Sequence, residues 1–160
     1  MIHIVSAKEE HIERILEIER EAISPPWSRE ALFDEMNRDD SYFAAALDKD
    51  GENFDICCQK NRPHCAVLAF VVVRQVGDDG ELLQIAVDKA ARRCGVGDLL
   101  IAHILSHAEK SGFKSVFLEV RSSNTAAVKL YEKHGFRAVR IRKSYYDKPV
   151  EDALVMAKTL

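Results

Sequence analysis

The chain has 160 residues, 47% of them hydrophobic, and a formal net charge of −3. This length predicts one domain over residues 1–160 with a substantial core, and the weakly acidic balance excludes general electrostatic attraction to nucleic acid. The first residues do not resemble a signal peptide, and the longest apolar run, Ala66 to Val73, is too short to span a bilayer. We therefore expect a cytoplasmic protein without membrane or nucleic-acid partners.

The first part of the chain predicts one strand followed by two helices. Ile2 to Val5 has the composition of a short strand, and the spacing of apolar residues predicts a helix over Lys8 to Ile23, ended by two prolines. Ser28 is a suitable cap for a second helix, whose apolar face is predicted to comprise Ala31, Leu32 and Met36. Trp27 stands between the two helices, either as a packing anchor or as part of a substrate wall.

The middle of the chain predicts three strands and one long polar loop. Strands are expected over Ser41 to Leu47, Cys65 to Val76 and Glu81 to Val87, and the loop over Asp48 to His64. The sequence G-D-D-G at Gly77 to Gly80 is a strong hairpin signal between the last two strands.

The remaining chain predicts helices that alternate with strands. Helices are expected over Gly97 to Ser111 and Asn124 to His134, each closed by a glycine, and strands over Ser115 to Val120, Phe136 to Ile141 and Ala153 to Ala157. Together these elements predict a mixed α/β or α+β domain with one central sheet.

Cysteines and histidines give no metal-site pattern. The four cysteines follow no regular disulfide framework, so we expect reduced thiols. The spacing of Cys57, Cys58, His64 and Cys65 matches none of the usual zinc patterns. His103 and His107 lie one helical turn apart without an evident third ligand, and we interpret them as solvated helix residues.

The stretch from Glu81 to Ile101 combines an apolar strand, a basic turn with Gly95 and Gly97, and the start of a helix. The first N–H groups of a helix have no intrahelical acceptor, so such a turn is suited to bind a phosphate. Arg92 and Arg93 add positive charge at this turn. A plain helix-entry turn is the structural alternative.

Two common phosphate-binding motifs do not fit this turn. A P-loop requires Lys followed by Ser or Thr after its glycine, whereas Gly97 is followed by Asp98 and Leu99. A dinucleotide motif requires a third glycine where Leu100 stands, and a turn directly after the strand rather than the seven residues from Asp88 to Cys94.

The remaining pattern, Arg92-x-x-Gly95-x-Gly97 after I-A-V-D, resembles the pyrophosphate loop of the Gcn5-related N-acetyltransferases, or GNAT enzymes. The segments P-W-S, F-L-E-V-R-S-S-N, K-L-Y-E-K-H-G-F, I-R-K-S-Y-Y and E-D-A-L-V-M resemble the RimI-like branch, over about Ile2 to Met156. Enzymes of this branch acetylate the N-terminal alanine of a small-subunit ribosomal protein. The resemblance implies a GNAT fold, with a mixed, mostly antiparallel sheet flanked by helices.

Two features depart from the branch. The segment Asp48 to His64 is longer than expected, which could alter substrate access, and Asp98 replaces a frequent basic residue, which could weaken phosphate binding slightly.

The resemblance also implies an acetyl-CoA site. The end of the strand, Ile85 to Val87, is expected to pair with the pantetheine. The amides from Arg93 to Asp98 are expected to hold the pyrophosphate. Asn124 contacts the cofactor, and it could at the same time cap its helix. Cys94 is interpreted as a small turn residue, since GNAT transfer uses no acyl-enzyme. The residues expected to bind acetyl-CoA are Ile85, Ala86, Val87, Arg92, Arg93, Cys94, Gly95, Val96, Gly97, Asp98 and Asn124.

Acyl transfer to an amine needs a base, because an unperturbed α-amino group has a pKa of roughly 7.7 to 8.0. Glu119 is the candidate base, since it interrupts the apolar run of a predicted central strand. The alternative is an ion pair with a nearby arginine, such as Arg121 or Arg137.

Tyr131 corresponds to the general acid that protonates the departing thiolate in similar enzymes. Its alternative is core packing in a helix. Tyr145 and Tyr146 are reserve proton donors, and their predicted loop position favours peptide recognition, so they join Trp27 as expected substrate-binding residues.

The resemblance thus predicts a protein N-terminal acetyltransferase that uses acetyl-CoA and no metal. Two alternatives stay open: a GNAT enzyme that acetylates a small amine or an internal lysine, and a non-catalytic acyl-CoA-binding module.

Overall fold

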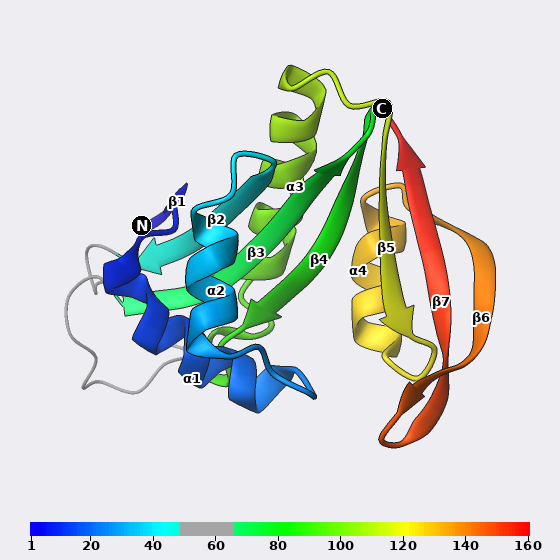
Figure 1. The fold of residues 1–160 in the computed structure, drawn as a ribbon, viewed down its shortest axis with the longest axis horizontal. Helices are drawn as coiled ribbons and strands as arrows, with labels where there is room; N and C mark the ends of the chain where they lie inside the picture. The colour runs from blue at the N-terminus through cyan, green and yellow to red at the C-terminus, as the bar shows by residue number, and fades with distance from the viewer. Residues whose placement is uncertain (49–65) are drawn as a thin grey trace. The chain divides into compact units, whose positions relative to one another are not determined.

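The structure, a computed structural model, describes residues 1–48 and 66–160. In these ranges a mixed α/β fold is formed, as the sequence predicts (Figure 1). Its strands are β1 (Ile2–Ser6), β2 (Ser41–Asp48), β3 (Ala66–Val76), β4 (Asp79–Val87), β5 (Ser115–Arg121), β6 (Arg137–Asp147) and β7 (Val150–Thr159). Its α-helices are α1 (Ile12–Ala22), α2 (Arg29–Met36), α3 (Val96–Lys110) and α4 (Thr125–Lys133).

The strands belong to one sheet with the hydrogen-bonded order β1-β2-β3-β4-β5-β7-β6. The pairs β1–β2, β5–β7 and β7–β6 are antiparallel, whereas β4 and β5 are parallel at Gly80 to Leu82. This mixed, mostly antiparallel sheet confirms the predicted fold class.

The described chain divides into two compact units. The first comprises Met1–Val72 and Gln84–Leu100, and the second comprises Val73–Leu83 and Ile101–Leu160. We describe each unit by itself. The expectation of a single domain over residues 1–160 stays a prediction.

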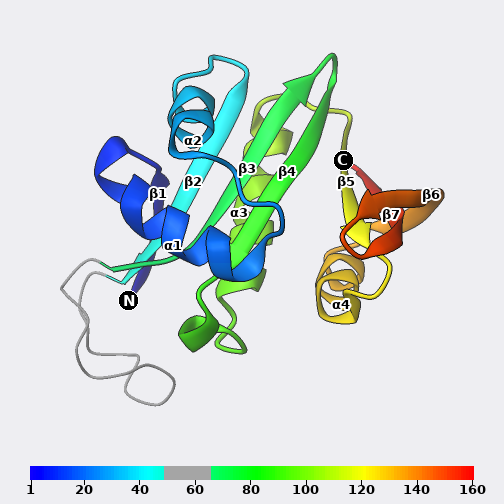
Figure 2. The ribbon, with the colours of Figure 1, turned by 60° about the horizontal axis from the view of Figure 1, so that its bottom comes forward.

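The first unit builds its core from α1, α2 and β2. Ile12, Ile15 and Ile18 of α1 are fully or almost fully buried, and β2 is buried on both faces from Phe43 onward, where three consecutive alanines allow close packing. Figure 2 shows α2 beside β2 and α1 beside α2. These elements support the segment between α1 and α2.

Two details of the first helices differ from prediction. A 3₁₀ turn, Glu9–His11, precedes α1, because the His11 ring Nδ1 accepts the Lys8 N–H at 3.0 Å and fixes a tighter start. In α2, Ala31 is exposed and Met36 half-buried, while Leu32 and Glu35 face inward. The helix begins at Arg29, so a spacing of three residues puts Leu32 and Glu35 on its inner side.

The hairpin predicted at Gly77 to Gly80 is confirmed, with a turn at Gly77-Asp78 between β3 and β4. Gly77 has φ +62°, a left-handed conformation that favours glycine.

In the second unit, the last two strands are longer than predicted. β6 ends at Asp147 and β7 begins at Val150. Tyr145 and Tyr146 therefore lie in a strand and not in a loop. β6 is an edge strand, and every residue in it except Tyr146 is exposed. An edge strand with two solvated faces needs no apolar alternation, which is why the sequence pattern did not reveal its full length.

None of the helices in residues 1–48 and 66–160 is long and apolar enough to cross a membrane. Within the same ranges, no three His, Cys, Asp or Glu side chains are grouped so that they could hold a metal ion. The predicted loop after Asp48, together with Cys57, Cys58, His64 and Cys65, lies outside the described residues.

Candidate functional site

The loop after β4 is fixed at its start by Asp88. This residue is buried, its N–H donates to the Leu68 carbonyl at 2.8 Å, and its side chain accepts the Ala90 N–H at 2.9 Å. Arg14 of α1 forms an ion pair with the same carboxylate. Asp88 therefore caps a 3₁₀ turn, Lys89–Ala91, and ties it to β3 and α1.

The basic turn leads directly into the 15-residue helix α3. Arg93 and Gly95 have φ +65° and +78°, and the first hydrogen bond of the helix links the Leu99 N–H to the Gly95 carbonyl at 3.1 Å. α3 begins at Val96, so Gly97 lies in its first turn rather than before it. A left-handed conformation is thus needed at Gly95, and the turn directs the N-terminus of a long helix toward an exposed basic loop.

The side chains of this turn differ in their environment. Arg92 and Arg93 are exposed, and the Arg92 Nε donates to the Val87 carbonyl at 3.1 Å, at the end of β4. The Cys94 thiol lies 3.5 Å from the Arg92 carbonyl, which agrees with a turn residue. Ala86 is buried, whereas its neighbours Ile85 and Val87 are partly exposed.

A buried carboxyl group, missed by the sequence analysis, supports Trp27. The Glu19 side chain is fully buried, and its Oε1 accepts the Trp27 N–H at 2.8 Å and the Gln84 Nε2–H at 2.9 Å. Burial raises the pKa of Glu19, and the two hydrogen bonds oppose that shift. A signal was present, since Glu19 follows Ile12 and Ile15 at the spacing of the inner face of α1.

Trp27 itself is partly exposed. Ser28, the next residue, caps α2 by accepting the Ala31 N–H at 3.1 Å, as predicted. Partial exposure leaves both interpretations of Trp27, packing anchor and substrate wall, as predictions.

In the second unit, Glu119 lies on the partly exposed face of β5. Val116, Leu118 and Val120 are buried on the other face, whereas Glu119 follows Phe117 on the partly exposed face. The alternation arises because successive side chains of a strand point to opposite faces. The Glu119 side chain is therefore partly exposed to solvent.

The Glu119 carboxylate has two partners. Its Oε1 lies 2.9 Å from the Arg142 Nε, so the predicted ion pair exists, but its partner is Arg142 and not Arg121 or Arg137. β6 is longer than predicted and includes Arg142, which pairs with Ala153 of β7, so the Arg142 side chain reaches Glu119 across β7. The Tyr145 hydroxyl also hydrogen-bonds to Glu119, and this bond is the main cause that raises the pKa of Tyr145.

Tyr131 in α4 is buried, with a relative exposure of 5%. Its ring packs edge-to-face on Phe136, with centroids 5.8 Å apart. Burial raises the pKa of Tyr131, with a further contribution from Tyr146, so the hydroxyl keeps its proton at neutral pH. Core packing of the ring is therefore present, and a proton-donating role is compatible with it.

Asn124 caps α4, because its side-chain oxygen accepts the Ala127 N–H at 3.2 Å. The predicted capping role is confirmed, while contact with a cofactor stays a prediction.

The structure brings one subset of the predicted site residues together. Glu119 and Tyr145 are hydrogen-bonded, Tyr146 packs edge-to-face on Tyr145 at 5.1 Å, and Tyr146 influences Tyr131 electrostatically. The phosphate-loop residues and Trp27 belong to the first unit. Glu119, Arg142, Tyr145 and Tyr146 are called the Glu119 group below. Arg142 is the member that the sequence analysis did not single out.

A carboxylate beside a tyrosine, together with a basic turn that opens a long helix, fits an acyltransferase of mixed α/β fold. The chain belongs to the acetyltransferase (GNAT) family, whose sequence model matches residues 12–136. It is 34% identical over 142 residues to the [ribosomal protein bS18]-alanine N-acetyltransferase of Escherichia coli K12. The match covers 88% of this chain and 85% of that protein. The predicted family resemblance is thereby confirmed.

Two solved structures share the fold. The crystal structure of the ribosomal-protein-S18-alanine N-acetyltransferase from Escherichia coli matches with a TM-score of 0.81 and 30% identity, over 99% of this chain and 94% of that one. Arabidopsis thaliana NAA60 in complex with acetyl-CoA matches with a TM-score of 0.84 and 18% identity, over 100% and 99% of the two chains. At that identity the second likeness supports the fold alone.

Proposed function

We propose that this protein transfers the acetyl group of acetyl-CoA to the N-terminal α-amine of a protein. The terminal alanine of a small-subunit ribosomal protein is the first substrate to test. The observation that carries this proposal is the 34% identity, over 88% of the chain, to an alanine N-acetyltransferase of a ribosomal protein. We place the reaction in the cytoplasm, as the sequence predicts.

The proposed donor site uses the first unit. The amides from Arg93 to Asp98 would hold the pyrophosphate, supported by the left-handed turn at Gly95 and the helix that follows it. Ile85 to Val87 would pair with the pantetheine, and Asn124 of the second unit would contact the cofactor. Exposed Arg92 and Arg93 favour an anionic ligand.

The proposed chemistry uses the second unit. The neutral amine attacks the thioester carbonyl, a C–N bond forms, and the C–S bond breaks. Glu119 accepts the proton that the amine loses, since its carboxylate lies on an open strand face with Arg142 and Tyr145 to orient it. Tyr131, whose hydroxyl is protonated at neutral pH, donates a proton to the departing CoA thiolate. The products are an N-acetylated protein and CoA.

The test is mass spectrometry of acetyl transfer to a set of synthetic peptides. The set contains peptides that start with alanine, serine or methionine, an N-terminally blocked peptide with an internal lysine, and a small polyamine. Transfer to the α-amine, with alanine preferred, is the expected result. Acetylation of only the blocked peptide or the polyamine would overturn the N-terminal assignment.

A binding measurement separates catalysis from simple binding. Calorimetry with acetyl-CoA, run beside thiol release with each peptide, is expected to show both binding and turnover. Binding without thiol release for any substrate would favour a non-catalytic module and contradict the proposal.

A further inference from the structure

A β-bulge lies in β6, directly beside the Glu119 group. Arg142 of β6 pairs with Ala153 of β7, and the next pair is Tyr146 with Glu151. The three residues from Lys143 to Tyr145 therefore lie opposite the single residue Asp152. Ser144, in the middle, has φ +49°, which is unusual for a residue other than glycine.

The bulge changes the direction of one side chain. Consecutive residues of a regular strand point to opposite faces. Glu119 and Arg121 share one face of β5, yet Tyr145 hydrogen-bonds to Glu119 while the Tyr146 ring lies 4.1 Å from the Arg121 guanidinium. Both tyrosines thus reach the same face of β5, and only a bulge permits this for neighbouring residues.

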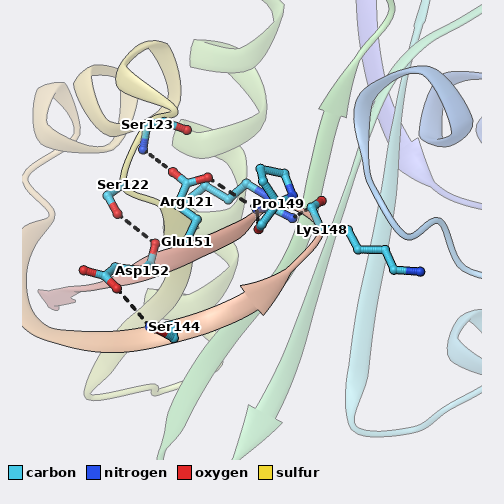
Figure 3. A network of polar contacts seen from close by, with 8 residues as sticks. All are labelled: Arg121, Ser122, Ser123, Ser144, Lys148, Pro149, Glu151 and Asp152. Atoms are coloured by element: carbon cyan, nitrogen blue, oxygen red, sulfur yellow. Dashed lines mark hydrogen bonds and ion pairs between the residues drawn. The ribbon is translucent and has the colours of Figure 1, made fainter.

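The Asp152 carboxylate holds the bulge in place. Its Oδ1 accepts the Ser144 N–H at 2.9 Å, and its Oδ2 pairs with the Lys143 Nζ at 3.0 Å (Figure 3 shows the Ser144 contact). The same two contacts, the Ser144 bond first, lower the pKa of Asp152. A charge-assisted bond to the backbone of the bulge offsets the cost of the left-handed conformation.

Asp152 is in turn anchored to the end of β5. Its carbonyl accepts the Ser122 N–H at 3.1 Å and the Ser122 hydroxyl at 2.8 Å. The neighbouring Glu151 carboxylate accepts the Ser123 N–H at 2.6 Å and pairs with Arg121 at 3.3 Å. In Figure 3 these contacts form one network between β5 and β7, so Asp152 is a fixed support for the bulge.

Arg121 extends this network to the turn between β6 and β7. Its guanidinium donates to the carbonyls of Lys148 and Pro149, at 3.3 and 3.2 Å, while its Cζ lies over the Tyr146 ring. Arg121 therefore links the end of β6 after the bulge to β5.

We propose that Asp152 is a positioning residue of the acceptor site. By holding the Ser144 bulge it directs the Tyr145 hydroxyl onto Glu119, and thereby sets the affinity for the N-terminal segment of the substrate protein. This inference rests on the proposed function, in which Glu119 is the base, and on the expectation from the sequence that Tyr145 and Tyr146 bind the substrate.

The kinetic test compares four variants with the wild type in the peptide assay. Asp152→Ala is expected to raise the KM for the peptide about tenfold, with the KM for acetyl-CoA unchanged, because the left-handed Ser144 loses its support. Asp152→Asn keeps an oxygen for the Ser144 N–H and is expected to retain most of the affinity. Lys143→Ala removes only the exposed ion pair and is the matched control.

The fourth variant is a rescue. In Asp152→Ala/Ser144→Gly, glycine adopts the left-handed conformation without steric cost, so the peptide KM is expected to return toward the wild-type value. A general loss of stability in Asp152→Ala would not be corrected in this way. Failure of the glycine to restore the peptide KM would contradict the inference.

The structural test needs no activity. In ¹³C-tyrosine NMR, the Tyr145 signal of the folded wild type is expected to titrate above its ordinary pKa, and Asp152→Ala is expected to lower that pKa. Ser144→Val, which disfavours a positive φ while keeping Asp152, should produce the same change if Asp152→Ala does not fold. An unchanged Tyr145 pKa in these variants overturns the role of Asp152, whether or not transfer is seen. Absence of acetyl transfer by the wild type overturns the proposed function instead.

Discussion

Glu19 in the first unit and Glu119 in the second have the same side chain in opposite environments. Glu19 is fully buried and accepts hydrogen bonds from one backbone N–H and one side-chain amide. Glu119 has a side chain that is 20% exposed, and it meets a guanidinium and a phenol. The first group links the Trp27 segment to β4, while the second stands where a substrate amine could reach it.

The difference shows how surroundings assign a carboxyl group to structure or to chemistry. Burial raises the pKa of Glu19, while its hydrogen bonds to Trp27 and Gln84 oppose that shift and make the carboxyl a fixed hydrogen-bond acceptor. Glu119 instead forms an ion pair with Arg142, and its side chain is partly exposed.

The largest effect is expected for Glu119→Gln. Loss of the proposed base should lower kcat at neutral pH by roughly 10²–10⁴-fold, the usual contribution of general acid–base catalysis. Acetyl-CoA binding, measured by calorimetry, should stay within about twofold of the wild type, a change of roughly 0.4 kcal/mol. Glu109→Gln, the same change on an exposed helix residue of the same unit, is the control. Turnover equal to that control would remove Glu119 from the mechanism.

Tyr131→Phe should have the next largest effect, a decrease in kcat of about 10²-fold, at the low end of the same range. The departing thiolate is a weak base, with a thiol pKa of roughly 8.5, so it depends less on a proton donor than the amine depends on a base. The ring contact with Phe136 is kept, so the thermal midpoint should change little. A wild-type rate with a good peptide substrate would exclude the proton-donating role.

Glu19→Ala tests the structural side of the comparison. It leaves the Trp27 N–H and the Gln84 amide without their acceptor in a buried place, so the free energy of unfolding should fall by about 2 kcal/mol. Glu119→Ala breaks a partly exposed ion pair and should lower it by less than about 1 kcal/mol. Urea denaturation of both variants gives the two values, and equal losses would contradict the assignment of Glu19 to structure.

The smallest effect concerns the pH dependence of stability. The raised pKa of Glu19 in the folded protein means that the native state binds a proton more tightly than the unfolded state. The stability of the wild type relative to Glu19→Gln should therefore be highest below the ordinary value of 4.5 and should fall as the pH rises through the folded pKa. Thermal midpoints of both proteins at several pH values measure this difference. A constant difference, or one that grows in favour of the wild type at high pH, contradicts a raised pKa of Glu19 in the folded protein.

The sequence by itself determined most of the secondary structure and the family. The apolar spacing in α1, the cap at Ser28, the glycines that end the later helices and the G-D-D-G turn are local signals, because each depends on neighbours within a few residues. The phosphate-loop pattern around Gly95 is equally local. These signals sufficed to predict a mixed α/β fold, and the resemblance of the loop and of later segments to the GNAT family added the acetyltransferase activity.

Tertiary structure decided which side chains meet. The length of β6 depends on pairing with β7, so the sequence placed Tyr145 in a loop and proposed Arg121 or Arg137 as the partner of Glu119. The bulge opposite Asp152 re-aims Tyr145 within an exposed edge strand, where no periodic pattern constrains the residues. Burial of Glu19 likewise depends on Trp27 and Gln84, which lie 8 and 65 residues away in the chain. Contacts between distant segments depend on how the whole chain packs, so a short stretch of sequence does not predict them.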